Sequence, residues 1–309
     1  MKETKPFLTV FTPAFNRAHT LHMNYEMLKK QRDKDFIWMI VDDGSTDNTK
    51  ELVSGWISEG AIRILYHKQE NKGKPSATNY SIKNSKSVLW VCIDSDDYIS
   101  ENAVAIIRRQ YENARLNPKC ACIIGNKYDM DTGNAVGVDG GTKYAIEFPK
   151  DIEYAYHWEI EYKYHIRADK VYFFFLDILK KYKYPIISDE KFIGESILFE
   201  QIGTDYQFYI IHQKLYFCKY LEDGLTASYL QLHIRNPKGY KMLKQQEMIY
   251  PKPLIEKFKS AIMYVAGCKL CHDKYIVYNS PKRIMAFLAY PFGLLAFQLK
   301  YLPLLKDTK

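Results

Sequence analysis

The feature that most constrains the fold of this chain is an alternation of short apolar runs and longer amphipathic stretches over residues 7–124. The runs are rich in β-branched and aromatic residues, which favours strands, and the stretches between them have helical spacing. We expect strands at residues 7–12, 36–41, 62–66, 88–93 and 120–124. We expect helices at residues 18–30, 48–58, 76–84 and 102–113. This alternation predicts an α/β fold with a mostly parallel central sheet and helices on both faces.

Polar residues directly follow three of the predicted strands. In a sheet of this kind a ligand binds outside the carboxyl ends of the strands. The residues found there are Pro13, Ala14, Phe15, Asn16 and Arg17 after the first run, Asp42, Asp43, Gly44 and Ser45 after the second, and Asp94, Ser95, Asp96 and Asp97 after the fourth. The sequence therefore predicts five carboxylates along one edge of one sheet.

Crowded carboxylates repel one another, so this arrangement favours a bound cation. Mg²⁺ and Mn²⁺ prefer oxygen ligands and often use only one or two protein carboxylates, with phosphate and water completing the shell. The pattern thus points to a substrate that carries a diphosphate. The alternative is that Asp42 and Asp43 are turn and cap residues and that residues 94–97 open the next helix.

Several other classes of protein find little support. The chain has neither a G-x-x-x-x-G-K-[ST] pattern nor a G-x-G-x-x-G pattern after a strand, which argues against a P-loop ATPase and a standard dinucleotide enzyme. The charged start is followed by an apolar run too short for a signal peptide, so we expect a cytoplasmic protein with free thiols. Cys268, Cys271 and His272 spell the haem-attachment pattern C-x-x-C-H, but without export we expect these cysteines to be buried thiols on a helix.

The net charge of +8 lies entirely in the C-terminal part of the chain. Residues 200–309 hold 16 Lys and Arg against 8 Asp and Glu. Such a region suits nucleic acid, an anionic membrane surface or a phosphorylated substrate.

An apolar segment at residues 284–305 has Lys300 as its only charge and contains Pro291, Gly293 and Pro303. It is too short and too interrupted for a membrane span, and its prolines argue against a straight helix. With Lys282, Arg283 and Lys306 at its ends, we expect it to lie at a membrane interface. The alternative is that it packs on the catalytic domain.

The polar strings together resemble the family 2 glycosyltransferases, whose GT-A fold is Rossmann-like. The resemblance rests on residues 12–17, 41–47 and 94–97 in this order, with Asn71, Lys72, Gly73, Lys74, Ala77 and Asn79 between the second and third strings. It implies a catalytic domain at residues 1–230, divided into a nucleotide-sugar half (1–125) and an acceptor half (126–230). A basic, helical and amphipathic extension would follow at residues 231–309, with membrane contact through residues 282–306.

The resemblance also implies roles for individual residues. The base of a nucleotide sugar, usually a uridine diphosphate (UDP) sugar, would be held by Pro13, Ala14, Phe15, Asn16 and Asp43. Lys72 and Lys74 would lie near the nucleotide or its phosphates. Asp96 would face the ribose and the metal, and Asp97 would be a ligand of the Mn²⁺ or Mg²⁺. The remaining candidates for the nucleotide-sugar site are Asp42, Asn79, Asp94 and Ser95.

The second half should supply the general base. In many relatives a Glu-Asp pair opens a helix that provides this carboxylate, but here the matching pair is Glu195 and Ser196. We take Glu195 as the first candidate and Glu190 as the second, because serine is not a base at neutral pH without help. The alternative for Glu195 is a helix N-terminal charge. Residues 220–226 also resemble a loop that closes over the donor in some members.

The expected function is therefore inverting, metal-dependent transfer of a sugar from a nucleotide diphosphate sugar to a glycan hydroxyl. The resemblance implies a lipid-linked acceptor in surface-polysaccharide synthesis, at the inner face of the plasma membrane. A sugar nucleotidyltransferase remains an alternative, although it normally has a glycine-rich, basic stretch after the first strand. A nucleic-acid-binding protein is a second alternative, although the acidic edge would repel a phosphate backbone and we expect no nucleic-acid partner. A processive synthase is disfavoured because the Q-x-x-R-W signature is absent, and the oligomeric state is left open.

Overall fold

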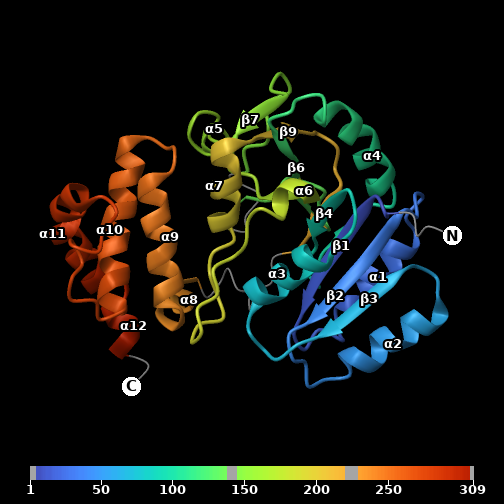
Figure 1. Cartoon of the computed structure of the whole chain (residues 1–309), viewed down its shortest axis with the longest axis horizontal. Coiled ribbons are helices and arrows are strands. Elements are labelled where there is room, and N and C mark those ends of the chain that lie inside the picture. The colour runs from blue at the N-terminus through green and yellow to red at the C-terminus, as the bar shows by residue number, and fades with distance from the viewer. Residues whose placement is uncertain (1–4, 138–144, 220–228, 307–309) are drawn as a thin grey trace. The chain divides into compact units, whose positions relative to one another are not determined.

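The structure is a computed structural model that describes residues 5–137, 145–219 and 229–306 (Figure 1). Residues 220–226, which resemble a donor-covering loop, lie outside the described residues.

The chain divides into two compact units. The first unit comprises Met1–Tyr184 and Asp205–Tyr220, and the second comprises Pro185–Thr204 and Leu221–Lys309. The division after residue 184 differs from the boundary at residue 230 that the resemblance implied. The functional assignment of the two domains stays a prediction.

The first unit is built on a ten-stranded sheet, of which four strands form a parallel block in the order β3-β2-β1-β4. These strands are β1 (Leu8–Ala14), β2 (Phe36–Asp42), β3 (Ile64–Lys68) and β4 (Leu89–Cys92). They confirm the expected positions to within two residues. Because Ala14 pairs with Asp42 and Phe11 pairs with Cys92, the carboxyl ends of β1, β2 and β4 meet at one edge of the sheet.

The sheet continues with an antiparallel strand that the sequence pattern did not predict. β8 (Lys170–Phe175) lies between β4 and β6 and runs antiparallel to both. The other strands are β5 (Tyr98–Ile99), β6 (Cys120–Asp129), β7 (Tyr154–Tyr156), β9 (Gln207–Ile210) and β10 (Tyr216–Cys218). In the parallel pair of β6 and β10, Tyr216 lies opposite Lys127. This pairing places Lys127 and Tyr216 side by side in the part of the sheet beyond β4 and β8.

Helices cover both faces of the parallel block. Phe11 and Thr12 are consecutive in β1 and therefore point to opposite faces. On one face the Trp38 ring donates to the Thr12 hydroxyl (3.0 Å) and stacks near Tyr25 of α1. On the other face Phe11 stacks on Trp90, whose ring nitrogen bonds to the hydroxyl of Ser81 in α3. The helices of this unit are α1 (Leu21–Lys29), α2 (Thr49–Glu59), α3 (Lys74–Asn84), α4 (Ala103–Ala114), α5 (His157–Tyr162) and α6 (Leu176–Leu179).

The second unit is helical, as expected for the C-terminal extension. Its helices are α7 (Ser196–Asp205), α8 (Tyr229–Arg235), α9 (Pro237–Ile249), α10 (Leu254–Leu270), α11 (Arg283–Lys300) and α12 (Leu302–Lys306). Within this unit α10 lies between α9 and α11 (Figure 1). Cys268 is buried on α10 and Cys271, just after this helix, is half-buried, and all six cysteines are free thiols. Across the described ranges, no helix combines the length and apolar character needed to cross a bilayer.

The apolar C-terminal segment contains a helix that continues past one of its prolines. α11 passes through Pro291 without ending. The pyrrolidine ring is tolerated because Pro291 lies on the exposed face of the helix, where a freed carbonyl can meet water. The opposite face packs tightly, since a Cβ at Gly293 would lie 2.4 Å from the Cβ of Val265 in α10. Ala286 and Ala289 are buried on this same face.

Candidate active site

The turns after β1 and β2 close on one another at the carboxyl edge of the sheet. Asn16 has a positive φ of 54°, and its side-chain oxygen accepts a hydrogen bond from the Thr46 amide at 2.8 Å. Asp42 is fully buried, and its carboxylate accepts hydrogen bonds from the Ser45 amide (2.7 Å) and from the Tyr66 hydroxyl. The contacts of Asp42 are therefore those of a turn residue, which was the alternative for this position.

Asp43 holds the loop that leads into α3. Its carboxylate accepts hydrogen bonds from the amides of Lys72 (2.9 Å) and Gly73 (2.7 Å) and from the side chain of Gln69 (2.7 Å). Gly73 has a φ of 87°, a conformation that glycine adopts without strain. The loop is thus fixed against the acidic edge by three bonds to one carboxylate.

The same loop connects Asp43 to the second acidic cluster. Lys74, the first residue of α3, places its ammonium 2.7 Å from the carboxylate of Asp94. Burial alone would raise the pKa of Asp94, but the charges of Lys74 and Lys127 outweigh this effect and hold the pKa below its ordinary value. Asp43 and Asp94 therefore bind adjacent residues of one loop, which brings the two acidic clusters together as expected.

Asp97 is the most buried of the three carboxylates in residues 94–97, with 6% of its surface exposed. The Tyr216 hydroxyl donates to its carboxylate at 2.6 Å and accepts a hydrogen bond from the Asp94 amide at 3.2 Å. Burial raises the pKa of Asp97 to about 8, and the charges of Asp94 and Asp96 add to this effect, while Lys127 opposes it. A metal ligand must be deprotonated, so a cation bound here would displace a proton at neutral pH.

Besides Tyr216, two other contributors to this site escaped the sequence analysis. Lys127 of β6 has its ammonium 3.2 Å from the carboxylate of Asp169. Burial would lower the pKa of Lys127, but Asp169, Asp97 and Asp94 raise it well above its ordinary value. Asn24 of α1 donates to the backbone carbonyls of Asp94 (3.1 Å) and Asp97 (2.6 Å), which shapes the acidic loop. Lys127 follows the apolar run at residues 120–124, and this position near the carboxyl end of a strand was the available signal for it.

The other predicted donor-site residues differ in how free they are to meet a ligand. Phe15 is 46% exposed, and the exposed Lys72 side chain lies 3.3 Å from Glu70. Asn79 is bonded at both ends of its side-chain amide to the backbone of Tyr184 (2.8 Å each), which is a structural role. Pro13 is half-buried, and Ala14 and Ser95 are buried.

The acidic residues suit a hard metal ion in chemistry but do not form a complete protein cage. Within the parts of the chain that the structure describes, no three His, Cys, Asp or Glu side chains come together as a metal site. Magnesium and manganese sites for phosphate substrates typically use one or two carboxylates. Asp96 and Asp97 supply two carboxylates, so the residues present fit such an ion.

The two candidates for the general base lie in the second unit. Glu195 directly precedes α7, whose first residue is Ser196, as the expected helix start requires. Glu190 caps α9, because its two carboxylate oxygens accept hydrogen bonds from the amides of Lys238 and Gly239 at 2.7 Å each. Both carboxylate oxygens of Glu190 therefore bind the first turn of α9.

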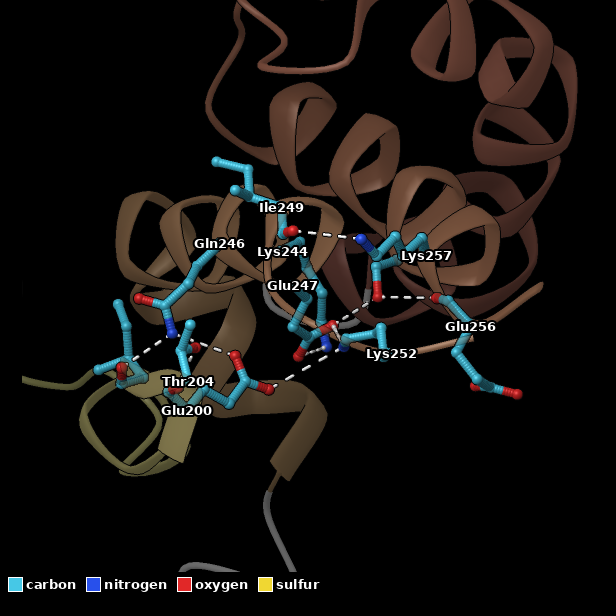
Figure 2. Close-up of polar contacts among 11 residues, drawn as sticks. Glu200, Thr204, Lys244, Gln246, Glu247, Ile249, Lys252, Glu256 and Lys257 are labelled. Carbon is cyan, nitrogen blue, oxygen red and sulfur yellow. Dashed lines mark hydrogen bonds and ion pairs between the residues drawn. The ribbon is translucent and has the colours of Figure 1, made fainter. Parts of the chain in front are cut away.

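A buried polar cluster joins α7 and α9 in the same unit (Figure 2). The Gln246 side chain donates to the Ile197 carbonyl (2.8 Å) and to the Glu200 carboxylate (3.1 Å). Burial raises the pKa of Glu200 to about 7, and the charge of Glu247 adds to this rise. Burial would also raise the pKa of Glu247, but Lys244 and Lys252 hold it below its ordinary value. The first turns of α7, which follow Glu195, are thereby fixed to α9.

Comparison with solved structures shows the fold. The structure of Staphylococcus aureus TarS 1–349 in complex with UDP-GlcNAc superposes with a TM-score of 0.61 at 13% identity, covering 94% of this chain and 80% of that one. The mannosyltransferase PcManGT from Pyrobaculum calidifontis, in complex with GDP-Man and Mn²⁺, superposes with a TM-score of 0.54 at 14% identity, covering 95% and 74%. Both support the GT-A fold.

Sequence comparison shows the family. Glycosyltransferase GlyG of Streptococcus pneumoniae is 26% identical over 259 residues, which are 82% of this chain and 79% of that protein. The poly-beta-1,6-N-acetyl-D-glucosamine synthase of Staphylococcus aureus is 29% identical over 140 residues, which are 45% of this chain and 32% of that protein. The profile described as "Glycosyl transferase family 2" matches residues 9–225, most of the chain. With this match and the acidic edge described above, the chain belongs to glycosyl transferase family 2 and is a glycosyltransferase.

Proposed function

We propose that this enzyme transfers a sugar from a UDP-sugar to a glycan hydroxyl, with inversion and with the help of a divalent cation. The observation that carries the proposal is the continuous chain of contacts from Asp43 through the loop of Lys74 to Asp94 and on to Asp97. It gathers at one sheet edge the acidic side chains that a metal and a diphosphate require. The UDP-GlcNAc bound to TarS and the Mn²⁺ bound to the mannosyltransferase agree with it.

In the proposed donor site, Asp96 and Asp97 hold Mn²⁺ or Mg²⁺. When bound, the metal supplies positive charge that stabilises the departing diphosphate. Lys72 adds positive charge from the loop fixed by Asp43. The exposed ring of Phe15 offers a surface for the nucleotide base.

In the acceptor half, Glu195 takes the proton of the acceptor hydroxyl as its oxygen attacks the anomeric carbon. Inversion follows from a single displacement. Glu195 is preferred over Glu190 because it directly precedes α7, at the position that matches the base of related enzymes, whereas Glu190 caps α9.

The proposed acceptor is a lipid-linked glycan in surface-polysaccharide synthesis, met at the cytoplasmic face of the membrane. The similarity to a polysaccharide synthase supports a glycan acceptor. The excess of positive charge in residues 200–309 supports a location of the enzyme beside an anionic membrane surface.

The decisive experiment measures nucleotide release from a panel of UDP- and GDP-sugars with Mn²⁺, with Mg²⁺ and with a chelator. We expect UDP release that depends on the metal and falls by about a hundredfold or more in Asp97→Asn. The matched control is Asp131→Asn, which changes an exposed carboxylate of the same unit. Within the described residues, the ion pair of Asp131 is with Lys219 at 2.7 Å. Release of pyrophosphate would instead identify a nucleotidyltransferase, and equal activity with the chelator would refute the metal.

A second pair of variants tests the base. Glu195→Gln should lower kcat by about a hundredfold while leaving UDP-sugar binding intact, since glutamine keeps the size of the side chain but cannot accept the proton. Glu190→Gln should lower the melting temperature through the weakened cap of α9 and spare kcat. The reverse pattern would transfer the role of base to Glu190.

A further inference from the structure

The outward face of α11 carries an uncovered apolar stripe. Its members are Ile284, Phe287, Leu288, Phe292, Leu295 and Leu299, which are between 51% and 80% exposed. Their spacing of three and four residues places them along one side of the helix, opposite the buried Ala286, Ala289 and Gly293. A soluble surface seldom exposes so many large apolar side chains in one place, so this face has the character of a binding surface.

The stripe extends onto the neighbouring helix. The Phe292 ring meets the ring of Phe258 in α10 edge to face, with centroids 6.2 Å apart. One turn before Phe258, at the start of α10, Leu254 and Ile255 are 73% and 60% exposed. The apolar surface is therefore wider than one helix.

Positive charge frames the stripe. Lys282 and Arg283 stand at the start of α11, Lys300 ends it, and residues 274–306 contain no Asp or Glu. Lys257 lies close enough to Lys282 and Lys252 that, after burial, their charges lower its pKa. Cations crowded at one end of an apolar face favour an anionic partner.

We propose that the outward face of α11 binds the surface of an anionic lipid bilayer, with the helix lying in the plane of the interface. An interfacial helix of 18 residues combines apolar side chains below the headgroups with basic residues among them. The inference deepens the proposed function, because a lipid-linked acceptor would be met at this same surface.

A second copy of this chain fits the face less well. In an antiparallel pair, Lys282 and Arg283 of one copy would face Lys300 of the other. In a parallel pair, each cationic end would face the same cationic end of the other copy. Neither arrangement meets an acidic side chain within residues 274–306, so like charges would repel in both.

Vesicle co-sedimentation tests the proposal. The full chain is mixed with vesicles of pure phosphatidylcholine or with vesicles of about one-third phosphatidylglycerol, at roughly 0.1 M and roughly 0.5 M salt. We expect binding to the anionic vesicles at low salt, and at least about tenfold weaker binding to neutral vesicles and at high salt. The double variant Phe287→Ser with Leu288→Ser should bind at least about tenfold more weakly than the wild type.

The matched control is Leu116→Ser, which removes an apolar side chain that is 77% exposed in the first unit. It should bind vesicles as the wild type does, and far-ultraviolet ellipticity should show that all variants are folded. The proposal is overturned if the wild type does not bind anionic vesicles, or if Leu116→Ser weakens binding as much as the double variant does. It is also overturned if sedimentation velocity shows a dimer that the double variant dissociates. Metal-dependent UDP release, measured without vesicles, should be unchanged in the double variant. If the wild type itself shows no metal-dependent UDP release, that result counts against the proposed function alone.

Discussion

Replacing Glu200 by Gln should stabilise the second unit above about pH 7 and change it little near pH 5. The folded state holds the proton of Glu200 more tightly than the unfolded chain, because burial raises its pKa to about 7 from its ordinary value of 4.5. Between these two values the folded state binds the extra proton, so stability falls as the pH rises. Glutamine keeps the acceptor for Gln246 and has no charge to bury.

The size of the effect follows from this difference in pKa. Each unit of pKa corresponds to about 1.4 kcal/mol. The full difference gives an upper bound of roughly 3 kcal/mol above about pH 7, and less than about 1 kcal/mol near pH 5. The Glu200 side chain is only 13% exposed, so solvent screens it weakly.

Glu247→Gln is the matched comparison, because the two carboxyl groups share one cluster but have opposite shifts. The pKa of Glu247 is lowered by Lys244 and Lys252, so its charge stabilises the fold and is lost only as the pH falls below about 4.5. Its replacement should destabilise the unit by about 1–4 kcal/mol near pH 7.5, since it leaves the buried Lys252 with one carboxylate fewer.

Urea unfolding, followed by ellipticity at about 222 nm, measures both variants at about pH 5 and about pH 7.5. Tryptophan fluorescence serves as an internal control, because all four tryptophans lie in the first unit. Equal effects of Glu200→Gln at the two pH values, or the same sign for both variants near pH 7.5, would refute the reasoning.

Three further substitutions probe other parts of the structure. Gly44→Ala should destabilise the first unit by about 1–3 kcal/mol in fluorescence-detected urea unfolding, because φ is 87° and a Cβ would lie 3.0 Å from the Asn71 amide. Gly293→Ala should lower the stability of the second unit by about 1–3 kcal/mol, seen by ellipticity, because the added methyl collides with Val265. Lys127→Met should raise the pKa of Asp97 further and weaken Mn²⁺-dependent UDP binding near pH 7 by about tenfold in calorimetry, an effect that should shrink near pH 9.

The parallel block of the sheet could be predicted because its signals are local. Each apolar run and each amphipathic stretch reports on its own segment, and parallel strands place their carboxyl ends together. Asp43 and Asp94 could thus be assigned to one edge from spacing alone. The distinction between Asp42, which is bonded within its turn, and Asp43, which holds the next loop, depends on contacts with Tyr66 and Gly73 that spacing does not determine.

The remaining parts depend on contacts between residues distant in the chain. Tyr216 is 119 residues from Asp97, and Lys127 reaches the site only because β8 enters the sheet antiparallel between β4 and β6. No local pattern specifies such a pairing. For Pro291, which lies inside α11, the general rule about helix interiors does not consider which side of the helix faces solvent.

The proline in α11 also limits how deep that helix can go. Pro291 has no amide hydrogen, so the carbonyl of Phe287, one turn earlier on the exposed side, has no intrahelical donor from this position. A bare carbonyl is costly in hydrocarbon but is readily hydrated among lipid headgroups. This backbone would therefore hold the enzyme at the level of the glycerol region, where it can leave the bilayer again.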